Sequence, residues 1–189
     1  MRITANRLWQ LVRTISVISV MSSIALTAGI TNYAAADTIP TITHGLIENV
    51  EYGDCLYVPN SSRSSGTFLT LTSCANRSNS FSQWYSYSVG NGRYSLNPAS
   101  NAALCMDVPG PYDQDPFERI EQWTCNGGLN QQLYFQHISG TPAGQYQITI
   151  ASGGLCLDTD ASGARWPLQN TCPPVSDPSQ RWIILPGNA

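Results

Sequence analysis

Two aspartates in the sequence stand in nearly identical phrases. Asp107 lies in LCMDV (104–108) and Asp158 in LCLDT (155–159), each two residues after a cysteine. The related phrase DCLYV (54–58) carries Tyr57 at the same place. A short carboxylate can accept charge-assisted hydrogen bonds from hydroxyl groups, and these are about twice as strong as neutral ones. The recurring phrase therefore marks two candidate binding acids and one copy that lacks the acid.

The sequence contains none of the common catalytic motifs. It has no G-x-S-x-G, H-E-x-x-H or P-loop segment, and its two histidines, His44 and His137, stand in ordinary strand or loop contexts. The acids that lie closest together are Asp113, Asp115, Glu118 and Glu121. Such a run is usually a solvated loop, whereas the carboxylate pair of a hydrolase comes from separate elements that face one cleft. We therefore expect a protein that is not an enzyme and that has no metal or cofactor.

The first 36 residues have the layout of a secretory signal peptide. Arg2, Arg7 and Arg13 precede an apolar segment at 14–30, and small residues at 34–36 precede Asp37. The alternative is a membrane anchor, but the apolar segment contains serines and threonines and is short for a span of about 20 apolar residues. We expect cleavage after Ala36, secretion of residues 37–189, and no membrane insertion after the signal is removed.

The predicted mature chain is acidic and sparsely charged. All nine basic residues of the sequence are arginines, and three of them leave with the signal peptide. The predicted mature chain then contains six arginines and twelve acidic residues, which gives a formal charge of −6. This charge argues against nucleic acid or another polyanion as a partner.

The elements that position the two aspartates recur with a period of about fifty residues. One series of cysteines lies at 55, 105 and 156, and a second lies at 74, 125 and 172. A third series consists of SQW (82–84), QQL (131–133) and QRW (180–182). Three series with one period predict three repeats, at about 42–90, 91–142 and 143–189, within a single domain.

An even number of cysteines in a secreted chain indicates disulfides. Six cysteines allow fifteen pairings, and the repeat favours the one in which each repeat closes its own loop. The predicted disulfides are Cys55–Cys74, Cys105–Cys125 and Cys156–Cys172.

Strand patterns fill the repeats. Four examples are TFLTLTSC (67–74), QWYSYSV (83–89), QYQITIA (145–151) and QRWIIL (180–185). They are short, rich in β-branched or aromatic residues, and separated by turn residues, and no helical period accompanies them. We therefore predict an all-β protein with about four strands per repeat, in which three units share one core around a pseudo-three-fold axis.

Taken together, these features resemble the ricin-type (R-type) β-trefoil lectins, a family that includes carbohydrate-binding modules of secreted bacterial hydrolases. The resemblance covers about residues 42–185 and is carried by CLYV…FSQWYSY, CMDV…IEQWTCNGGLNQQLYF and CLDT…SQRWII. The Q-x-W triplet of the family is intact only at 180–182, since Ser82 replaces the Gln in the first repeat and Leu133 replaces the Trp in the second. The resemblance implies a β-trefoil and makes Trp84, Leu133 and Trp182 core residues.

In the resembled lectins, an Asp, an aromatic residue and an Asn or Gln converge on a sugar. The carboxylate and the amide bind hydroxyls, and the ring covers the C–H face of the sugar. The second repeat supplies the matching positions Asp107, Glu121, Trp123, Asn130 and Gln131. Glu121 stands where the family usually has Gln. The alternative is structural: Asp107 orders the turn that follows it, and Trp123 is a buried strand residue.

The third repeat matches the sugar site only in part. Asp158 is present, but Asn170 stands at the aromatic position, and Leu168 and Ser179 replace the two amides. Trp166 is close enough in sequence to act as a displaced aromatic platform, and Asp158 has the same turn-forming alternative as Asp107. The first repeat has lost every polar position of the site.

Two functions follow from this sequence. The first is a secreted lectin that binds a glycan through the second repeat. The second is a trefoil that binds a protein partner without sugar, as the cell-binding or scaffold subunit of a toxin or as an inhibitor of hydrolases, because fold alone does not fix function. The segment 109–119 would be its contact loop.

Overall fold

The computed structural model describes residues 42, 44–111, 113–142, 144–160, 162–173 and 177–187. The predicted signal peptide, 1–36, lies outside the described residues.

The described residues form thirteen strands, whose order fits the three predicted repeats. The first repeat holds β1 (Gly45–Asn49), β2 (Asp54–Tyr57), β3 (Thr67–Phe68), β4 (Thr70–Ser73) and β5 (Trp84–Gly90). The second holds β6 (Arg93–Pro98), β7 (Leu104–Asp107), β8 (Glu121–Thr124) and β9 (Leu133–His137). The third holds β10 (Gln145–Ile150), β11 (Cys156–Thr159), β12 (Pro167–Asn170) and β13 (Trp182–Pro186).

Helical structure in the described residues is limited to three 3-10 segments of three residues each. They are η1 (Pro59–Ser61), η2 (Leu129–Gln131) and η3 (Pro178–Gln180). Within this part of the chain, none of the helical segments has the length and apolar character needed to cross a membrane.

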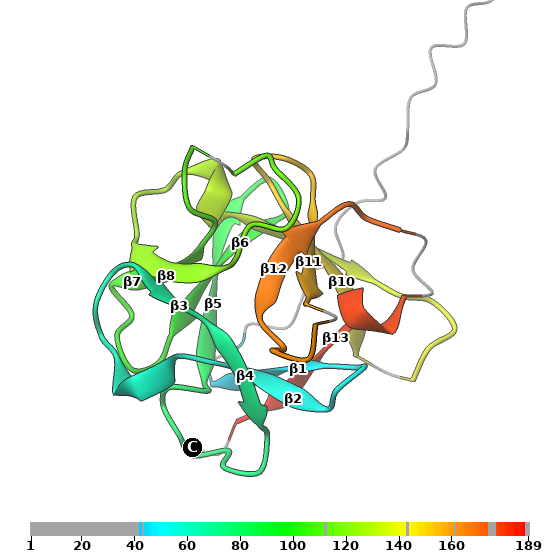
Figure 1. Ribbon diagram of the computed structural model, residues 1–189, viewed down its shortest axis with the longest axis horizontal. Helices are drawn as coiled ribbons and strands as arrows, with labels where there is room; N and C mark the ends of the chain where they lie inside the picture. The colour runs from blue at the N-terminus through cyan, green and yellow to red at the C-terminus, as the bar shows by residue number, and fades with distance from the viewer. Residues whose placement is uncertain are drawn as a thin grey trace, which may run out of the picture. The chain divides into compact units, whose positions relative to one another are not determined.

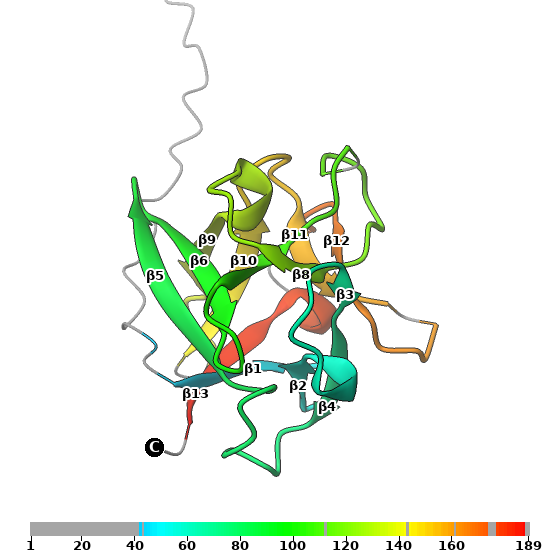
Figure 2. The same ribbon diagram turned by 90° about the vertical axis from the view of Figure 1, so that its left-hand side faces the viewer.

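Six strands of the described residues close into a ring in the order β1, β5, β6, β9, β10 and β13. The ring closes because β13 pairs with β1 over five residue pairs, from Gly45↔Pro186 to Asn49↔Trp182. Figure 2 shows the long β5–β6 pair along one side of this barrel. Closure removes the unpaired edges that an open sheet would expose.

One hairpin from each repeat lies outside the ring. The hairpins are β2–β4, β7–β8 and β11–β12, and Figure 1 shows them arranged around the middle of the view. The predicted disulfides Cys55–Cys74, Cys105–Cys125 and Cys156–Cys172 are all present, one per hairpin. The all-β β-trefoil fold and the cysteine pairing are therefore confirmed.

The predicted core residues are also confirmed. Trp84, Leu133 and Trp182 are completely buried. The Nε1–H of Trp84 donates to the Leu56 carbonyl at 3.2 Å, and that of Trp182 donates to the Leu157 carbonyl at 2.9 Å. Each indole therefore fixes its barrel strand to the hairpin of the same repeat, while its ring fills the shared core.

One pairing crosses the boundary between repeats. The short strand β3 of the first repeat pairs with β8 of the second through Thr67↔Gln122 and Phe68↔Glu121. The pairing continues where the Leu69 amide donates to the Ile120 carbonyl at 2.9 Å. Together, β3, β8 and β7 form a three-stranded sheet whose outer face carries the predicted site.

Candidate binding site

Asp107 ends strand β7 and is held by two side-chain amides. Its Oδ2 accepts hydrogen bonds from Asn130 Nδ2 at 3.0 Å and from Gln131 Nε2 at 2.7 Å. Its Oδ1 accepts none from the described residues. Only 4 % of Asp107 is exposed, and this burial raises the pKa of the carboxyl to about 6, although the two amide bonds oppose the shift. Oδ2 is thus fixed by the protein, whereas Oδ1 is not fixed by any of the described residues.

Gln131 acts within the protein as the residue that orients Asp107. It is buried, and its second N–H donates to the Thr124 carbonyl at 3.0 Å, while its Oε1 accepts from the Asn126 amide at 2.8 Å. All of its polar atoms are therefore engaged. Gln131, predicted to contact the sugar, uses these groups in this structure to hold Asp107 and the adjoining backbone.

Asn130 precedes Gln131 in η2 and is half-buried. Its second N–H donates to the Val108 carbonyl at 2.9 Å, so both donors of the amide are used inside the protein. Its Oδ1 accepts no hydrogen bond from the described residues. Asn130 can therefore accept a hydrogen bond from a ligand hydroxyl, but it has no N–H left to donate.

Glu121 and Trp123 stand on the same outward face as Asp107. Asp107 lies directly across from Glu121 in the β7–β8 pairing, and Trp123 is the next residue on that face of β8. Trp123 is exposed whereas Ile120 and Gln122 are completely buried, which identifies the outward face, and Glu121 is itself only 7 % exposed. Burial and the nearby charge of Asp107 raise the pKa of Glu121, so ionisation of Glu121 is disfavoured.

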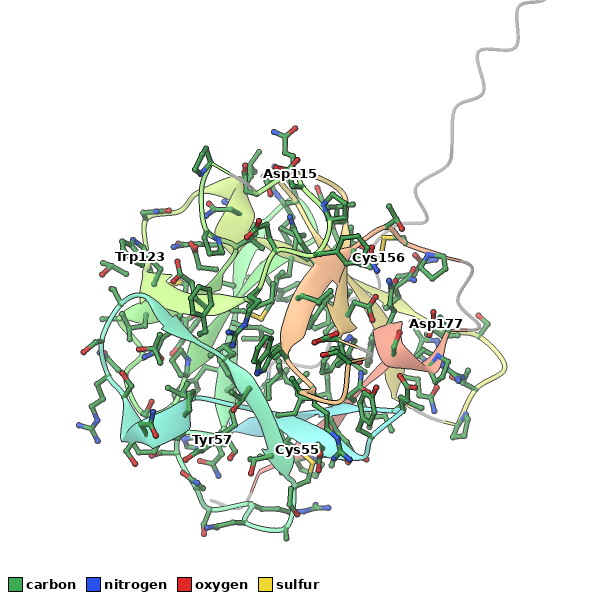
Figure 3. The ribbon with its side chains drawn as sticks, viewed as in Figure 1. Cys55, Tyr57, Asp115, Trp123, Cys156 and Asp177 are labelled. Carbon is green, nitrogen blue, oxygen red and sulfur yellow. A yellow bond between two sulfur atoms is a disulfide. The ribbon has the colours of Figure 1, made fainter. Side chains whose placement is uncertain are left out.

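Trp123 is a surface residue, so the interpretation of it as a buried strand residue is wrong. Its side chain is 43 % exposed, and Figure 3 shows it at the periphery of the fold. The loop before β3 lies against the ring: a Cβ added to Gly66 would stand 3.3 Å from Trp123 Cζ3. Gly66 also has a φ of +79°, which favours glycine. The first repeat thus supports the aromatic residue of the second.

In the third repeat, both oxygens of the equivalent acid accept hydrogen bonds from the protein. Asp158 Oδ2 accepts from Asn170 Nδ2 at 3.1 Å and from Gln180 Nε2 at 2.9 Å, and Oδ1 accepts from the Thr159 amide at 2.6 Å. Asn170 stands where Trp123 stands in the second repeat and uses its amide to hold the acid. The other candidate, Trp166, stacks with Arg119 of the second repeat. Both oxygens of Asp158 are therefore occupied, in contrast to Asp107.

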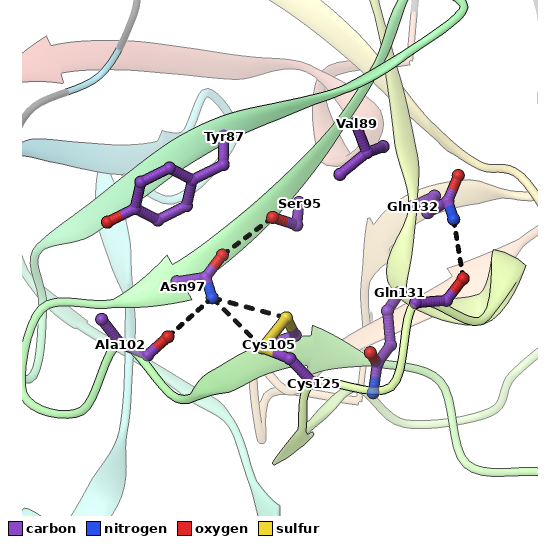
Figure 4. A pocket seen from close by; sticks show the side chains of 10 residues that line it. Tyr87, Val89, Ser95, Asn97, Ala102, Cys105, Cys125, Gln131 and Gln132 are labelled. Atoms are coloured by element: carbon purple, nitrogen blue, oxygen red, sulfur yellow. Dashed lines mark hydrogen bonds between the residues drawn. A yellow bond between two sulfur atoms is a disulfide. The ribbon is translucent and has the colours of Figure 1, made fainter.

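A groove of about 300 Å³ lies beside the Cys105–Cys125 disulfide (Figure 4). Tyr87, Val89 and Gln131 are among the residues that line it. Its polar groups bond to one another: Ser95 Oγ donates to Asn97 Oδ1 at 2.9 Å, and Asn97 Nδ2 donates to the Ala102 carbonyl at 3.0 Å. The groove therefore offers few free polar groups, and of the predicted site residues it contains only Gln131.

Among the described residues, no group of three or more His, Cys, Asp or Glu side chains is arranged to hold an ion. The Asp107 face presents carboxyl and amide oxygens and the exposed indole of Trp123.

Comparison with known proteins identifies the family to which this chain belongs. Residues 43–182 match the ricin-type β-trefoil lectin domain. The chain therefore belongs to the ricin-type β-trefoil lectin domain family, as its repeats predict. A search of curated proteins found no match.

Solved structures share the fold at low sequence identity. A designed three-fold symmetric protein, ThreeFoil, superposes with a TM-score of 0.67 at 21 % identity, covering 75 % of this chain and 97 % of its own. An exo-β-1,3-galactanase from Clostridium thermocellum gives 0.67 at 22 % identity, covering 78 % of this chain and 31 % of its own. A Polyporus squamosus lectin bound to a sialylated sugar gives 0.63 at 18 % identity, covering 78 % and 50 %. The chain thus spans only part of the last two proteins.

Proposed function

We propose that this protein is a secreted, non-catalytic lectin that holds one pyranose on the outer face of the β7–β8 hairpin. The proposal rests on the hydrogen bonds and the surroundings of Asp107. Its Oδ2 is fixed by Asn130 and Gln131, its Oδ1 accepts no hydrogen bond from the described residues, and the same sheet face carries the exposed indole of Trp123. The equivalent acid in the third repeat is fixed in the same way, but its Oδ1 accepts from the Thr159 amide, and Asn170 replaces the exposed indole.

Each residue has a distinct part in the proposed binding. Asp107 Oδ1 accepts from a sugar hydroxyl, with the strength of a charge-assisted bond. Asn130 Oδ1 accepts from a neighbouring hydroxyl, and the ring of Trp123 covers the C–H face. Glu121 accepts hydrogen bonds when ionised and can donate one when protonated. A single shallow site of this kind has a Kd between about 1 mM and about 10 µM, so strong attachment requires a multivalent surface.

The carboxyl pair of the site is not arranged for hydrolysis. Asp107 and Glu121 are cross-strand neighbours on one sheet face. A glycosidase needs its two carboxyls on opposite sides of the scissile bond. A sugar resting on this face has both acids on the same side, which supports binding without catalysis.

The proposal is tested by replacing the aromatic platform. Trp123→Ala removes the stacking surface but no core contact, so we expect retention on a glycan array to fall at least about tenfold. The matched control is Tyr134→Ala, because Tyr134 is also an exposed aromatic residue on a strand and lies on β9. Equal retention of both variants and the wild type on every glycan would exclude the Trp123 site.

A second prediction concerns the loop that places Asn130. A methyl group on Gly128 would overlap Asn130 Oδ1 and lie 2.9 Å from Asn126 Oδ1, while the backbone of Gly128 (φ −63°, ψ 155°) accepts alanine. Gly128→Ala should therefore displace Asn130 and weaken sugar binding about three- to tenfold, with less than about 1 kcal/mol lost in stability.

Calorimetric titration and urea unfolding measure the two effects of Gly128→Ala. Gly110→Ala is the control, because a Cβ at Gly110 meets no atom within 4 Å. Unchanged affinity in Gly128→Ala would show that Asn130 does not contact the sugar.

A protein-binding function remains the competing proposal, because Phe117 is 68 % exposed in the loop 109–119. A cytolethal distending toxin chain from Haemophilus ducreyi shares the fold, with a TM-score of 0.60 at 15 % identity. If this protein is a toxin subunit or an inhibitor, it will give no glycan signal, and Phe117→Ala will weaken a complex with a secreted partner. A glycan signal that is lost in Trp123→Ala would decide for the lectin.

Secretion is supported by the predicted signal peptide and by three disulfides, which persist in oxidising compartments. Mass spectrometry of the exported protein should find Asp37 at the N-terminus. A protein that stays in the cytosol with reduced cysteines would contradict this part of the proposal.

A further inference from the structure

Three residues at equivalent positions of the repeats come together in one stack. Phe68, Arg119 and Trp166 each lie six residues before the second cysteine of their repeat. The guanidinium carbon of Arg119 lies 4.6 Å from the ring centroid of Phe68 and 4.0 Å from that of Trp166. We call these three residues the central stack. Cation–π contacts to both rings hold the guanidinium in place.

The central stack is open to solvent. Phe68 is 42 % exposed and Trp166 is 39 % exposed. Arg119 makes one long hydrogen bond, from Nη2 to the Leu69 carbonyl at 3.5 Å, and no carboxylate of the described residues lies within salt-bridge distance of it. Two exposed aromatic rings therefore flank a half-buried guanidinium that has unused donors.

This stack borders the proposed sugar site. Arg119, Glu121 and Trp123 alternate along one face of β8 and its approach, because Ile120 and Gln122 between them are completely buried. Across the sheet, Glu121 lies opposite Asp107 on one side and opposite Phe68 on the other. The strands are spaced by about 4.8 Å, so Asp107 and Phe68 are about 10 Å apart on one continuous face.

We propose that the central stack is a second subsite, which binds the next residue of an uncharged oligosaccharide whose first residue occupies the Asp107 site. This inference rests on the proposed lectin function and extends it. The rings of Phe68 and Trp166 offer stacking surfaces, and the edge of Arg119 donates to hydroxyl or ring oxygens. The subsite is built from all three repeats.

The charges around the stack favour a neutral sugar. Asp107 and Glu121 lie on the same face, and the charge of Asp160 acts on Arg119. A carboxylate on the second sugar would meet one guanidinium and three acids. The hydroxyls of a neutral sugar avoid this repulsion and still satisfy the guanidinium.

The test compares sugars of two lengths. The probes are galactose, glucose, mannose and N-acetylglucosamine, each as the monosaccharide and as its homotrisaccharide, together with trigalacturonate. For the sugar that binds, the trisaccharide should bind about tenfold or more tightly than the monosaccharide. Phe68→Leu and Trp166→Leu keep apolar bulk but remove a ring, and each should lower this ratio at least about threefold without changing monosaccharide affinity. Tyr87→Leu, on an exposed aromatic residue of β5, is the control.

The outcomes separate this inference from the proposed function. If Trp123→Ala abolishes binding of both lengths but the ratio is the same in wild type, Phe68→Leu and Trp166→Leu, the Asp107 site stands and the second subsite does not. Tighter binding of trigalacturonate than of trigalactose would overturn the uncharged ligand. Absence of binding to every probe and to every glycan of the array would remove the lectin function and the subsite together. Urea unfolding of each variant shows whether a loss reflects misfolding.

Discussion

Asp107→Asn should weaken sugar binding about ten- to a hundredfold at pH 7.5 and at the same time make the unliganded protein more stable. The substitution keeps an oxygen that can accept from Asn130 and Gln131, so the internal hydrogen bonds survive. It places an amide nitrogen where the free Oδ1 stood and removes the charge. Loss of one charge-assisted bond to a hydroxyl costs about 1.5–3 kcal/mol, which corresponds to the expected loss of affinity.

The stability gain follows from the raised pKa. Burial lifts the pKa of Asp107 to about 6 in the folded protein, whereas its ordinary value is 3.8. Between these values the folded state binds more protons than the unfolded state, so the contribution of this group to stability is lost as the pH rises from about 4 to about 6. A shift of about two pKa units corresponds to at most about 3 kcal/mol, and the Asn variant does not suffer this loss.

Both effects can be measured on one series of proteins. Urea unfolding at pH 4, 5, 6 and 7.5 should show the wild type losing more stability than Asp107→Asn over this range, and sugar affinity of the wild type should fall below about pH 6 as Asp107 protonates. Asp158→Asn is the matched control, since Asp158 is an equally buried acid held by Asn170 and Gln180. Full affinity in Asp107→Asn, or equal losses in both variants, would contradict the assignment.

Trp182→Ala should be the most destabilising single substitution considered for this protein, with a cost of about 3–5 kcal/mol. The side chain is completely buried in the shared core, and its Nε1–H donates to the Leu157 carbonyl. The variant would leave a large cavity and an unpaired carbonyl. Because a domain of this size is stable by only about 5–15 kcal/mol, a substantial part of the folding free energy would disappear.

Guanidinium unfolding of the oxidised proteins, followed by circular dichroism, measures this cost. Trp182→Phe retains most of the ring packing and loses the donor, so its cost should be about 1–2 kcal/mol. Leu133→Ala, at the equivalent position of the second repeat, should cost about 2–5 kcal/mol. A loss below about 1 kcal/mol in Trp182→Ala would show that the three equivalent positions do not form one core.

The sequence predicts most of the fold because the repeat links several observations to one period. The spacing of the cysteines selects one of the fifteen pairings, and the structure contains that pairing. The Q-x-W positions predict Trp84, Leu133 and Trp182 as core, and all three are completely buried. Burial at these positions is what the resemblance to the ricin-type lectins implies, and the spacing of the triplets places the three residues at equivalent positions of the repeats.

The sequence does not predict the contacts made between repeats. Nothing in the strand pattern indicates that β3 leaves its own repeat to pair with β8, because pairing partners depend on three-dimensional position. The stacking of Trp166 with Arg119 was missed for the same reason, although the equal spacing of Phe68, Arg119 and Trp166 from the cysteines was a signal that could have found it. The internal role of Gln131 also required the structure, since a side-chain amide in a binding motif can face either the ligand or the protein.

The pairing of β3 with β8 limits how the sequences of the three repeats can diverge. The first repeat has Tyr57 in place of an acid, so sugar recognition does not constrain the residues on its own surface. Gly66 of the first repeat, however, lies against Trp123 of the second repeat, and Phe68 pairs with Glu121. A repeat without a sugar site is therefore still constrained at the residues that support its neighbour. Sequence change in the first repeat should be confined to the positions that no other repeat contacts.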